Sequence, residues 1–429
     1  TVTAADGSTA TYTVTVTPAF DNIIDLTAYL LSVSGGYTSA DPVPLTVSLD
    51  LASDWGNLLS AIQTEGKFVA LDLSACTMPG TEFDPGAADT GEDKIVSLVL
   101  PGAAKEIKDS YSYPGPTFRF FTKLETVTGA NIQSVGQNAF QSCTTLIEVN
   151  LPEAASIGYR AFKSCTALVD LNLPAATSIG PNAFDSCTAL VDLNLPAATS
   201  IGYNAFDSCT ALITVTLPEA TFIDYGAFTD CTALTTVSLP EAISIGGYAF
   251  NTCNALTTVS LPKAESIGDW AFAFCITLTE LSLPAAESIG ILAFRACSAL
   301  TTVTLPAATS IGATAFQQCN ALTTVSLPVV ASIGYSAFAN TGDTALTVSL
   351  GNTAPGLGTR LFNGVTAAKN VTVKVPPGAA GYGTVPGTYS GTDSTACWGN
   401  GFRFGGWNDG VMLSGAMNSY INLTITYTP

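Results

Sequence analysis

The chain has 429 residues, and its 47% hydrophobic content is enough for folding, although the length is too great for one ordinary core. Acidic residues number 33 against 14 basic ones, and the net charge of -19 disfavours nucleic acid and anionic lipid as partners. The chain contains no histidine, which removes the commonest general base and metal ligand. No apolar run reaches the length of a membrane span, so we expect no membrane insertion.

The first segment, residues 1–20, is predicted to be a terminal strand region. The chain opens at Thr1 rather than Met and shows no signal peptide, which indicates a processed product or an excised fragment. Residues 11–16 alternate Thr with Tyr or Val, a strand pattern without an obvious partner in this chain. Two explanations stay open: a stub of a truncated upstream domain, or a strand that pairs with another sheet edge, such as residues 421–427.

Residues 21–94 are predicted to form an αβ cap. Residues 45–49 alternate as a strand, and residues 55–62 carry apolar side chains at helical spacing. Ser53 is the expected N-cap of this helix, and Gly66 is expected beyond its C-terminus. A second strand is expected over residues 68–73, ending near Cys76.

Residues 95–350 contain a repeat with a step of 22 residues. A cysteine and a phenylalanine three residues before it recur at this step, together with a Leu-Pro pair. The columns are Phe140, Phe162, Phe184, Phe206, Phe228, Phe250, Phe272, Phe294 and Phe316, with Cys143, Cys165, Cys187, Cys209, Cys231, Cys253, Cys275, Cys297 and Cys319. A fixed period in this range predicts a repeat solenoid in which each repeat is one turn.

Each unit is predicted to have a strand followed by a short helical turn. Residues 168–174 alternate apolar and polar side chains and end at a proline, which stops a strand. Ile179 is expected to point inward, and Phe184, Cys187 and Leu190 follow at a spacing of three, typical of one helical turn with a buried face. One turn alone cannot repay the entropy of ordering its backbone, so adjacent turns must stack into a parallel sheet.

The cysteine column has two interpretations. Redox or metal chemistry is one, but no Cys-x-x-Cys motif occurs, and a row of single thiols lacks the clustered geometry that zinc requires. The other interpretation, which we favour, is a column of small buried hydrophobic side chains. Cys76 and Cys397 lie outside the column at opposite ends and are not expected to pair.

Residues 351–429 are rich in glycine and proline and are predicted to form a β-rich C-terminal cap, with strands near 371–375 and 420–427. Trp398, Phe402, Trp407 and Asp409 cluster there. This cluster could be a small ligand or enzyme site, or the core of the cap. No nucleophile is placed beside a base, so we expect no enzyme.

Two outward-facing sets of side chains are candidates for ligand binding. The first follows the strands and is polar, with the members Glu148, Asn150, Asp170, Asn172, Asp192 and Asn194. Its three carboxylates stack on consecutive turns, where Ca²⁺ could bridge them; a solvated acidic patch is the alternative. No other cofactor is expected.

The second set is aromatic and follows the Ile-Gly turn, with the members Tyr159, Tyr203, Tyr225, Tyr248 and Trp270, and Tyr335 further along. Exposed aromatic side chains of this kind anchor interfaces. They could equally pack against neighbouring turns and cover the edge of the core.

The pattern Ile201-Gly202, Ala205-Phe206, Cys209, Leu212, Val215 and Leu217-Pro218 resembles the BspA-like class of bacterial leucine-rich repeats. The resemblance covers residues 95–350 and implies an extracellular or cell-surface protein, with adhesion to host matrix proteins or to other bacteria as its role. Residues 1–16 are similar to the last hairpin of a bacterial immunoglobulin-like module.

Two functions are therefore carried forward. The first is a non-enzymatic, exported binding protein that recognises a protein ligand through the solenoid surface. The second is a structural subunit that assembles head-to-tail by strand exchange through residues 1–18.

Overall fold

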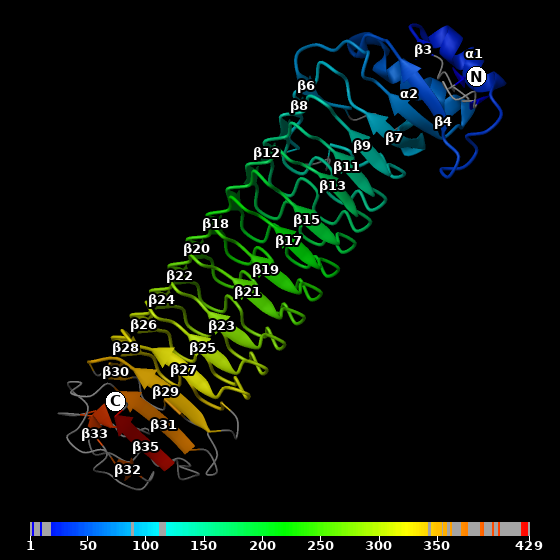
Figure 1. The fold of residues 1–429 in the computed structure, drawn as a ribbon. Coiled ribbons are helices and arrows are strands. Elements are labelled where there is room, and N and C mark those ends of the chain that lie inside the picture. Colours follow the sequence, from blue (N-terminus) through cyan, green and yellow to red (C-terminus); the bar gives the residue numbers. More distant parts are fainter. Residues whose placement is uncertain are drawn as a thin grey trace.

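The computed structural model describes residues 19–86, 90–110, 117–341, 345–353, 355–357, 361–362 and 370–375, and outside these ranges only the backbone of six short strands. Parallel strands stack along an elongated rod of about 14 turns, with the two ends of the chain at opposite ends of the rod (Figure 1). This is the leucine-rich-repeat solenoid that the 22-residue period predicts. Among the described residues, no helix is long and apolar enough to cross a membrane.

The N-terminal segment combines two helices with strands of the rod. It contains β3 (Ala19–Phe20), α1 (Ile23–Ser32), β4 (Val43–Val47), α2 (Leu51–Glu65), β5 (Val69–Asp72) and η1 (Glu92–Lys94). The predicted N-cap was wrong: Ser53 lies inside α2, and Asp50 caps it by accepting a hydrogen bond from the Ala52 N–H. Gly66 ends the helix in the left-handed conformation as expected. Helix α1 was not predicted.

Each turn places one strand of three to five residues on one side of the rod. Except at two breaks, these strands pair in parallel with the equivalent strand of the next turn, so identical columns lie side by side. They are β7 (Ile95–Val99), β9 (Thr126–Thr128), β11 (Glu148–Asn150), β13 (Asp170–Asn172), β15 (Asp192–Asn194), β17 (Thr214–Thr216), β19 (Thr236–Ser238), β21 (Thr258–Ser260), β23 (Glu280–Ser282), β25 (Thr302–Thr304), β27 (Thr324–Leu327) and β29 (Leu346–Leu350).

A second side is a 13-stranded parallel sheet of two-residue strands, most of them Ser-Ile pairs. The sequence predicted only an inward isoleucine and a turn here, so this sheet is a feature that the periodicity did not identify. Its strands are β6 (Glu82–Phe83), β8 (Glu106–Ile107), β10 (Ser134–Val135), β12 (Ser156–Ile157), β14 (Ser178–Ile179), β16 (Ser200–Ile201), β18 (Phe222–Ile223), β20 (Ser244–Ile245), β22 (Ser266–Ile267), β24 (Ser288–Ile289), β26 (Ser310–Ile311), β28 (Ser332–Ile333) and β30 (Gly356–Leu357).

The third side carries the phenylalanine and cysteine columns on consecutive tight turns. Within one repeat, the Cys187 N–H donates to the Phe184 carbonyl, and the Leu190 N–H donates to the Cys187 carbonyl, each three residues back. Two residues of each such segment adopt positive φ, for example Asn204 at 50° and Ser208 at 59°. Their N–H groups donate to the next turn, so this side is also tied by backbone hydrogen bonds.

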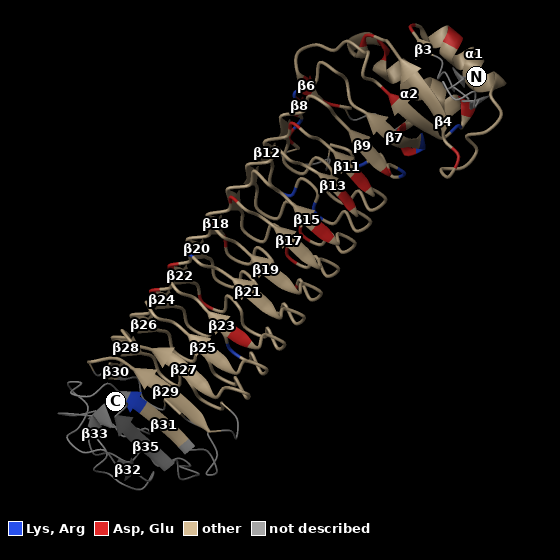
Figure 2. Cartoon of the chain, viewed as in Figure 1, with Lys and Arg blue, Asp and Glu red and all other residues tan. Residues whose placement is uncertain are grey.

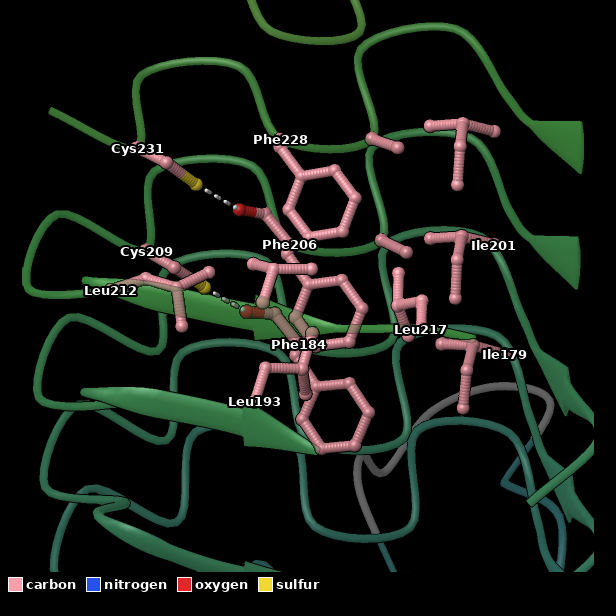
Figure 3. Packing of buried hydrophobic residues seen from close by; sticks show 14 of the residues in the cluster. Ile179, Phe184, Leu193, Ile201, Phe206, Cys209, Leu212, Leu217, Phe228 and Cys231 are labelled. Carbon is pink, nitrogen blue, oxygen red and sulfur yellow. Dashed lines mark hydrogen bonds between the residues drawn. The ribbon is translucent and has the colours of Figure 1, made fainter. Parts of the chain in front are cut away.

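The core is a continuous set of identical layers. The phenylalanine rings stack from Phe118 to Phe362; around Phe206 the neighbouring centroids are 5.1 and 5.3 Å away, and the rings are nearly parallel. Figure 3 shows these rings between the inward isoleucines and leucines of the two sheets. Every layer is therefore buried only because another layer covers each of its faces, as the entropy argument requires.

The first side is not one sheet. It divides into sheets that run from β3 to β13, from β15 to β21, and from β23 onward. At the last strand before each break, the inward side chain, Leu171 or Val259, is only partly buried, whereas Val149 and Leu193 are buried. The two-residue strands on the second side continue across both breaks.

The C-terminal end continues the parallel stacking. Residues 346–350 pair with β27 one residue later than the period requires, as the shifted leucine predicts. The strands that follow are β31 (Asn370–Val375), β32 (Gly387–Tyr389), β33 (Cys397–Trp398), β34 (Phe402–Arg403) and β35 (Asn422–Tyr427). Strand β35 lies between β31 and β32, so the expectation that it offers an open edge for assembly is wrong.

At the N-terminus, the strands β1 (Val2–Thr3) and β2 (Thr9–Ala10) pair with each other in antiparallel fashion. The predicted strand over residues 11–16 lies outside the described residues. The likeness to an immunoglobulin-like hairpin and the role in assembly both stay predictions.

A column of glycines follows the inward isoleucines because the turns approach closely there. A Cβ at Gly268 would lie 2.5 Å from the Gly247 nitrogen and 2.6 Å from the Gly246 carbonyl carbon, both backbone atoms. Asp224 takes this place in one turn, so the fold absorbs one side chain in the column. Glycine therefore permits the close spacing of most turns, although φ is not positive at Gly268.

Gly268→Ala is expected to lower the free energy of unfolding by about 1–3 kcal/mol, because the added methyl group meets backbone that cannot move independently. The matched control is Gly56→Ala inside α2, where the added Cβ has no atom within 4 Å. That change is expected to raise stability by about 0.5–1 kcal/mol. Urea unfolding of the two variants measures both; equal effects would contradict the close-packing explanation.

Candidate functional site

The cysteine column is sealed inside the rod. Cys143 to Cys319 are buried free thiols, and each Sγ–H of the column donates to the carbonyl of the phenylalanine one turn earlier, as Cys209 does to Phe184 at 3.2 Å (Figure 3). Burial raises the pKa of the Cys143 and Cys297 thiols to about 12. A buried, protonated thiol is neither a nucleophile nor a metal ligand, so the column holds turns together and offers no reactive group.

The polar strand set lies on the exposed side of the first sheets. Glu148 and Asp170 face each other in register, and the Asn172 amide donates to Asn150 Oδ1 at 2.8 Å. Further along, the Thr214 hydroxyl donates to Asp192. These contacts between turns make the set part of the exposed polar ladder of the sheet, and Asn194 is exposed beside it.

The calcium hypothesis finds no support in this geometry. Among the residues that the structure describes, no three or more Asp, Glu, Cys or His side chains gather in a way that could hold a metal ion. The three carboxylates of the strand set come from successive turns, one from each, and Asp192 accepts from a threonine. Such a row is a polar surface rather than a coordination cage.

The aromatic set is brought together only in part. The rings of Tyr203, Tyr225, Tyr248 and Trp270 contact one another in sequence over four turns, with centroids 5.4, 5.1 and 5.5 Å apart. We call these four residues the aromatic ladder. Tyr203 and Tyr225 are 44% and 42% exposed. Tyr159 instead lies 4.7 Å from the Arg160 guanidinium, and Tyr335 is beyond the ladder.

The ladder changes column halfway. Tyr203 and Tyr225 lie three residues before the core phenylalanine of their turns, whereas Tyr248 and Trp270 lie two residues before it. The second position has positive φ, and other turns place Asn204 or Gly226 there. Rings from two columns still meet, with a 40° tilt between Tyr225 and Tyr248 at the crossing. The rings pack on one another and still reach solvent, and a role of the aromatic set in binding stays a prediction.

An arginine side chain of the same chain covers one end of the aromatic ladder. The Arg295 guanidinium lies 5.4 Å from the Trp270 ring centroid and 5.5 Å from that of Phe274. Phe274 in turn contacts Trp270 at 6.4 Å. Neither Arg295 nor Phe274 was predicted as a site residue from the sequence. The sequence does show a change at these places: the first position after the core phenylalanine changes from Asp to Arg along the rod, and the second changes from Ser to Phe.

Aspartates occupy those same two positions in earlier turns: Asp185 is buried, and Asp207 and Asp230 are half-buried. Asp185 pairs with Lys163 and accepts from Ser186, and Asp207 accepts from Ser208 at 3.0 Å. Burial raises the pKa of Asp207, and the negative charges of Asp185 and Asp230 raise it further. Three neighbouring turns therefore carry carboxylates that repel one another.

The middle of the rod is free of unpaired cations. No Lys or Arg occurs between Lys163 and Lys263, and both of these pair with acids, Asp185 and Glu241. Figure 2 shows acidic positions recurring along this part of the rod. The aromatic ladder thus lies largely within a region whose net charge is negative.

The remaining sequence candidates cannot be assembled into a site. Trp398 and Phe402 face each other in the antiparallel pair of β33 and β34, and only their backbone is described. Trp407 and Asp409 lie outside the described residues, as does the side chain of Cys397. Cys76 is buried, and its Sγ–H donates to the Val47 carbonyl.

Comparison with known proteins adds a family and a fold. A sequence profile described as the BspA type leucine rich repeat region matches in six copies over residues 112–235, 221–345 and 287–375, more than half of the chain. No curated protein matches the chain.

Among solved structures, a leucine rich cell surface protein from Faecalibacterium prausnitzii is 25% identical over 56% of this chain and 81% of its own, with a TM-score of 0.34. A leucine-rich repeat protein from Bacteroides ovatus is 22% identical over 65% and 87%, with a TM-score of 0.35. One from T. pallidum is 30% identical over 37% and 80%, also at 0.35. All three TM-scores are below 0.5, so the family assignment rests on the profile.

Proposed function

Because the chain belongs to the BspA-type leucine-rich-repeat family, we propose that it is a non-catalytic recognition protein that binds a protein partner through the outside of the rod. The supporting observation is the division of its side chains. The inward columns are apolar and, apart from the partly buried Leu171 and Val259, fully buried, including the column thiols, while the outward columns are hydroxyls, carboxylates, amides and partly exposed aromatic rings. Repeat proteins of this shape present extended surfaces to large partners.

The proposed location is the cell surface or the extracellular space, and the proposed role is adhesion to host matrix proteins or to another bacterial surface. The cysteines that the structure describes are compatible with an oxidising compartment, because all of them are buried and inaccessible to an attacking thiol.

The test is a binding screen of the purified chain against immobilised matrix proteins and intact bacterial cells. A triple variant with alanine at Tyr203, Tyr225 and Trp270 removes the ladder, and a second variant, Asp170→Ala with Asn172→Ala, alters the strand set. Loss of binding in either variant supports recognition through that face. The proposal fails if no partner binds, or if binding is indifferent to both changes.

Head-to-tail assembly through residues 1–18 is the alternative role. Deleting these residues is expected to convert an assembled form to a monomer, which light scattering measures. A monomer with the segment intact would refute it.

A further inference from the structure

The aromatic ladder is an unusual surface because its rings are both exposed and fixed. Tyr203 and Tyr225 leave 44% and 42% of their surface exposed, yet their rings are parallel within 7° at 5.4 Å. Rings held in this way lose little conformational freedom when a partner binds them. The ladder is therefore prepared for contact before any partner arrives.

The chain shows what kind of group can bind the ladder. At its C-terminal end the Arg295 guanidinium lies beside Trp270 and Phe274, at 5.4 and 5.5 Å from their centroids. These distances are in the range of cation–π attraction. A guanidinium is thus compatible with the ladder in size and charge.

The equivalent positions elsewhere carry the opposite charge. Arg295 directly follows the core phenylalanine of its turn, the place that Asp207 has in an earlier turn. Phe274 has the place that Asp230 has two turns earlier. Asp207 follows Tyr203 by four residues on the same tight turn, where the Asp207 N–H donates to the Asn204 carbonyl, and Asp230 follows Tyr225 by five residues on the next turn. No arginine of the chain replaces either aspartate on these two turns.

Neither aspartate forms an ion pair in the described part of the chain, although the charge of Lys163 partly offsets the rise in the pKa of Asp207. The ion pairs of this region use Lys163 and Lys263, with Asp185 and Glu241. Asp207 is half-buried near two other carboxylates, and their repulsion adds to burial in raising its pKa. A cation supplied from outside would relieve this repulsion.

We propose that the aromatic ladder, together with Asp207 and Asp230 on the turns of Tyr203 and Tyr225, binds an arginine-rich segment of a protein partner. Arginine is favoured over lysine because its planar guanidinium stacks on aromatic rings and forms forked hydrogen bonds with carboxylates. A second copy of this chain is disfavoured because each copy carries a net charge of -19. The proposal rests on the proposed recognition function and identifies the chemistry of the partner.

The experiment measures binding of a fluorescently labelled peptide of alternating arginine and glycine to the full chain, by anisotropy. Peptides of the same length with lysine or glutamate in place of arginine are the ligand controls. The double variant Tyr203→Ala with Tyr225→Ala removes two rings of the aromatic ladder. The double variant Asp207→Asn with Asp230→Asn removes two carboxylate charges and keeps the shape of the side chains. Tyr335→Ala is the matched control, because Tyr335 belongs to the same column as Tyr203 and is 43% exposed, but lies beyond the ladder.

The arginine peptide is expected to bind more tightly than the lysine peptide, and the glutamate peptide is expected not to bind. Each double variant should weaken arginine binding about tenfold. Tyr335→Ala should leave it unchanged. Added salt and a fall in pH through the pKa of Asp207 should both weaken binding, since each reduces the attraction of the carboxylates.

Equal affinity for the arginine and lysine peptides, or equal losses in Tyr335→Ala and the ladder variants, would overturn the inference. Circular dichroism of each variant separates loss of binding from loss of fold, and the aspartate-to-asparagine pair preserves side-chain volume. If a partner from the binding screen still binds while the arginine peptide does not, this inference fails and the recognition function stands. Failure of both assays refutes both.

Discussion

Phe206→Ala is expected to lower the free energy of unfolding by about 3–5 kcal/mol. The ring is fully buried and lies between Phe184 and Phe228, at 5.1 and 5.3 Å. Removing it leaves a cavity that adjacent turns cannot fill, because their own positions are fixed by hydrogen bonds on all three sides. Urea unfolding followed by circular dichroism measures the loss.

Phe222→Ala is the matched control for this prediction. Phe222 lies in β18 within the neighbouring repeat, at a place where most other turns have serine, and its side chain is 42% exposed. Its replacement is expected to change stability by no more than about 0.5 kcal/mol. A comparable loss from both substitutions would show that aromatic content, rather than the inner stack, stabilises the rod.

Alkaline pH is expected to unfold the rod cooperatively above about pH 9. Burial raises the pKa of the column thiols, to about 12 for Cys143 and Cys297, whereas an unfolded thiol titrates near about 8.5. The folded state keeps protons that the unfolded state loses, so the stabilisation is complete below the unfolded pKa and is lost as the pH rises toward the folded pKa. In that window each thiol lowers the free energy of unfolding by about 1.4 kcal/mol for every pH unit. The nine thiols of the column together lower it by about 12 kcal/mol for every pH unit.

The thiols can be separated from other titrating groups with one variant. Cys209→Ala loses a buried sulfur and its hydrogen bond to the Phe184 carbonyl, so it is less stable than the unmodified chain near about pH 8. By about pH 10 this difference should shrink by about 2 kcal/mol, because the variant has one thiol fewer to ionise on unfolding. A difference that is constant with pH would contradict the role given to the column.

The solenoid could be predicted because the same side chains recur every 22 residues. Apolar columns at this step have one physical explanation, which is burial between stacked turns. Inward and outward sides of the long strands follow from alternation, as at Leu193 between Asp192 and Asn194. The second sheet was missed because two-residue strands such as Ser200–Ile201 are too short to show alternation. They exist because the equivalent pair one turn away supplies their hydrogen bonds, which no local pattern encodes.

The candidate surface was predicted only as a set of residue types. Tyr203 and Tyr248 belong to different columns, so the register gave no reason to expect that they join one ladder through Tyr225. Ring contacts depend on backbone conformation at positive φ, and the position of Arg295 over Trp270 depends on a long side chain reaching the previous turn. Both are details of packing between turns and are invisible in a single repeat.

The layers of the rod are equivalent, and this affects how the number of repeats in the gene can change. Ring stacking, thiol hydrogen bonds and glycine contacts all join a turn only to its immediate neighbours. Excising or duplicating one whole 22-residue unit would therefore reconnect equivalent partners and leave no exposed core. Unequal recombination within such a gene can therefore change the length of the protein while every layer stays covered, and the outer columns gain or lose one residue each with every turn.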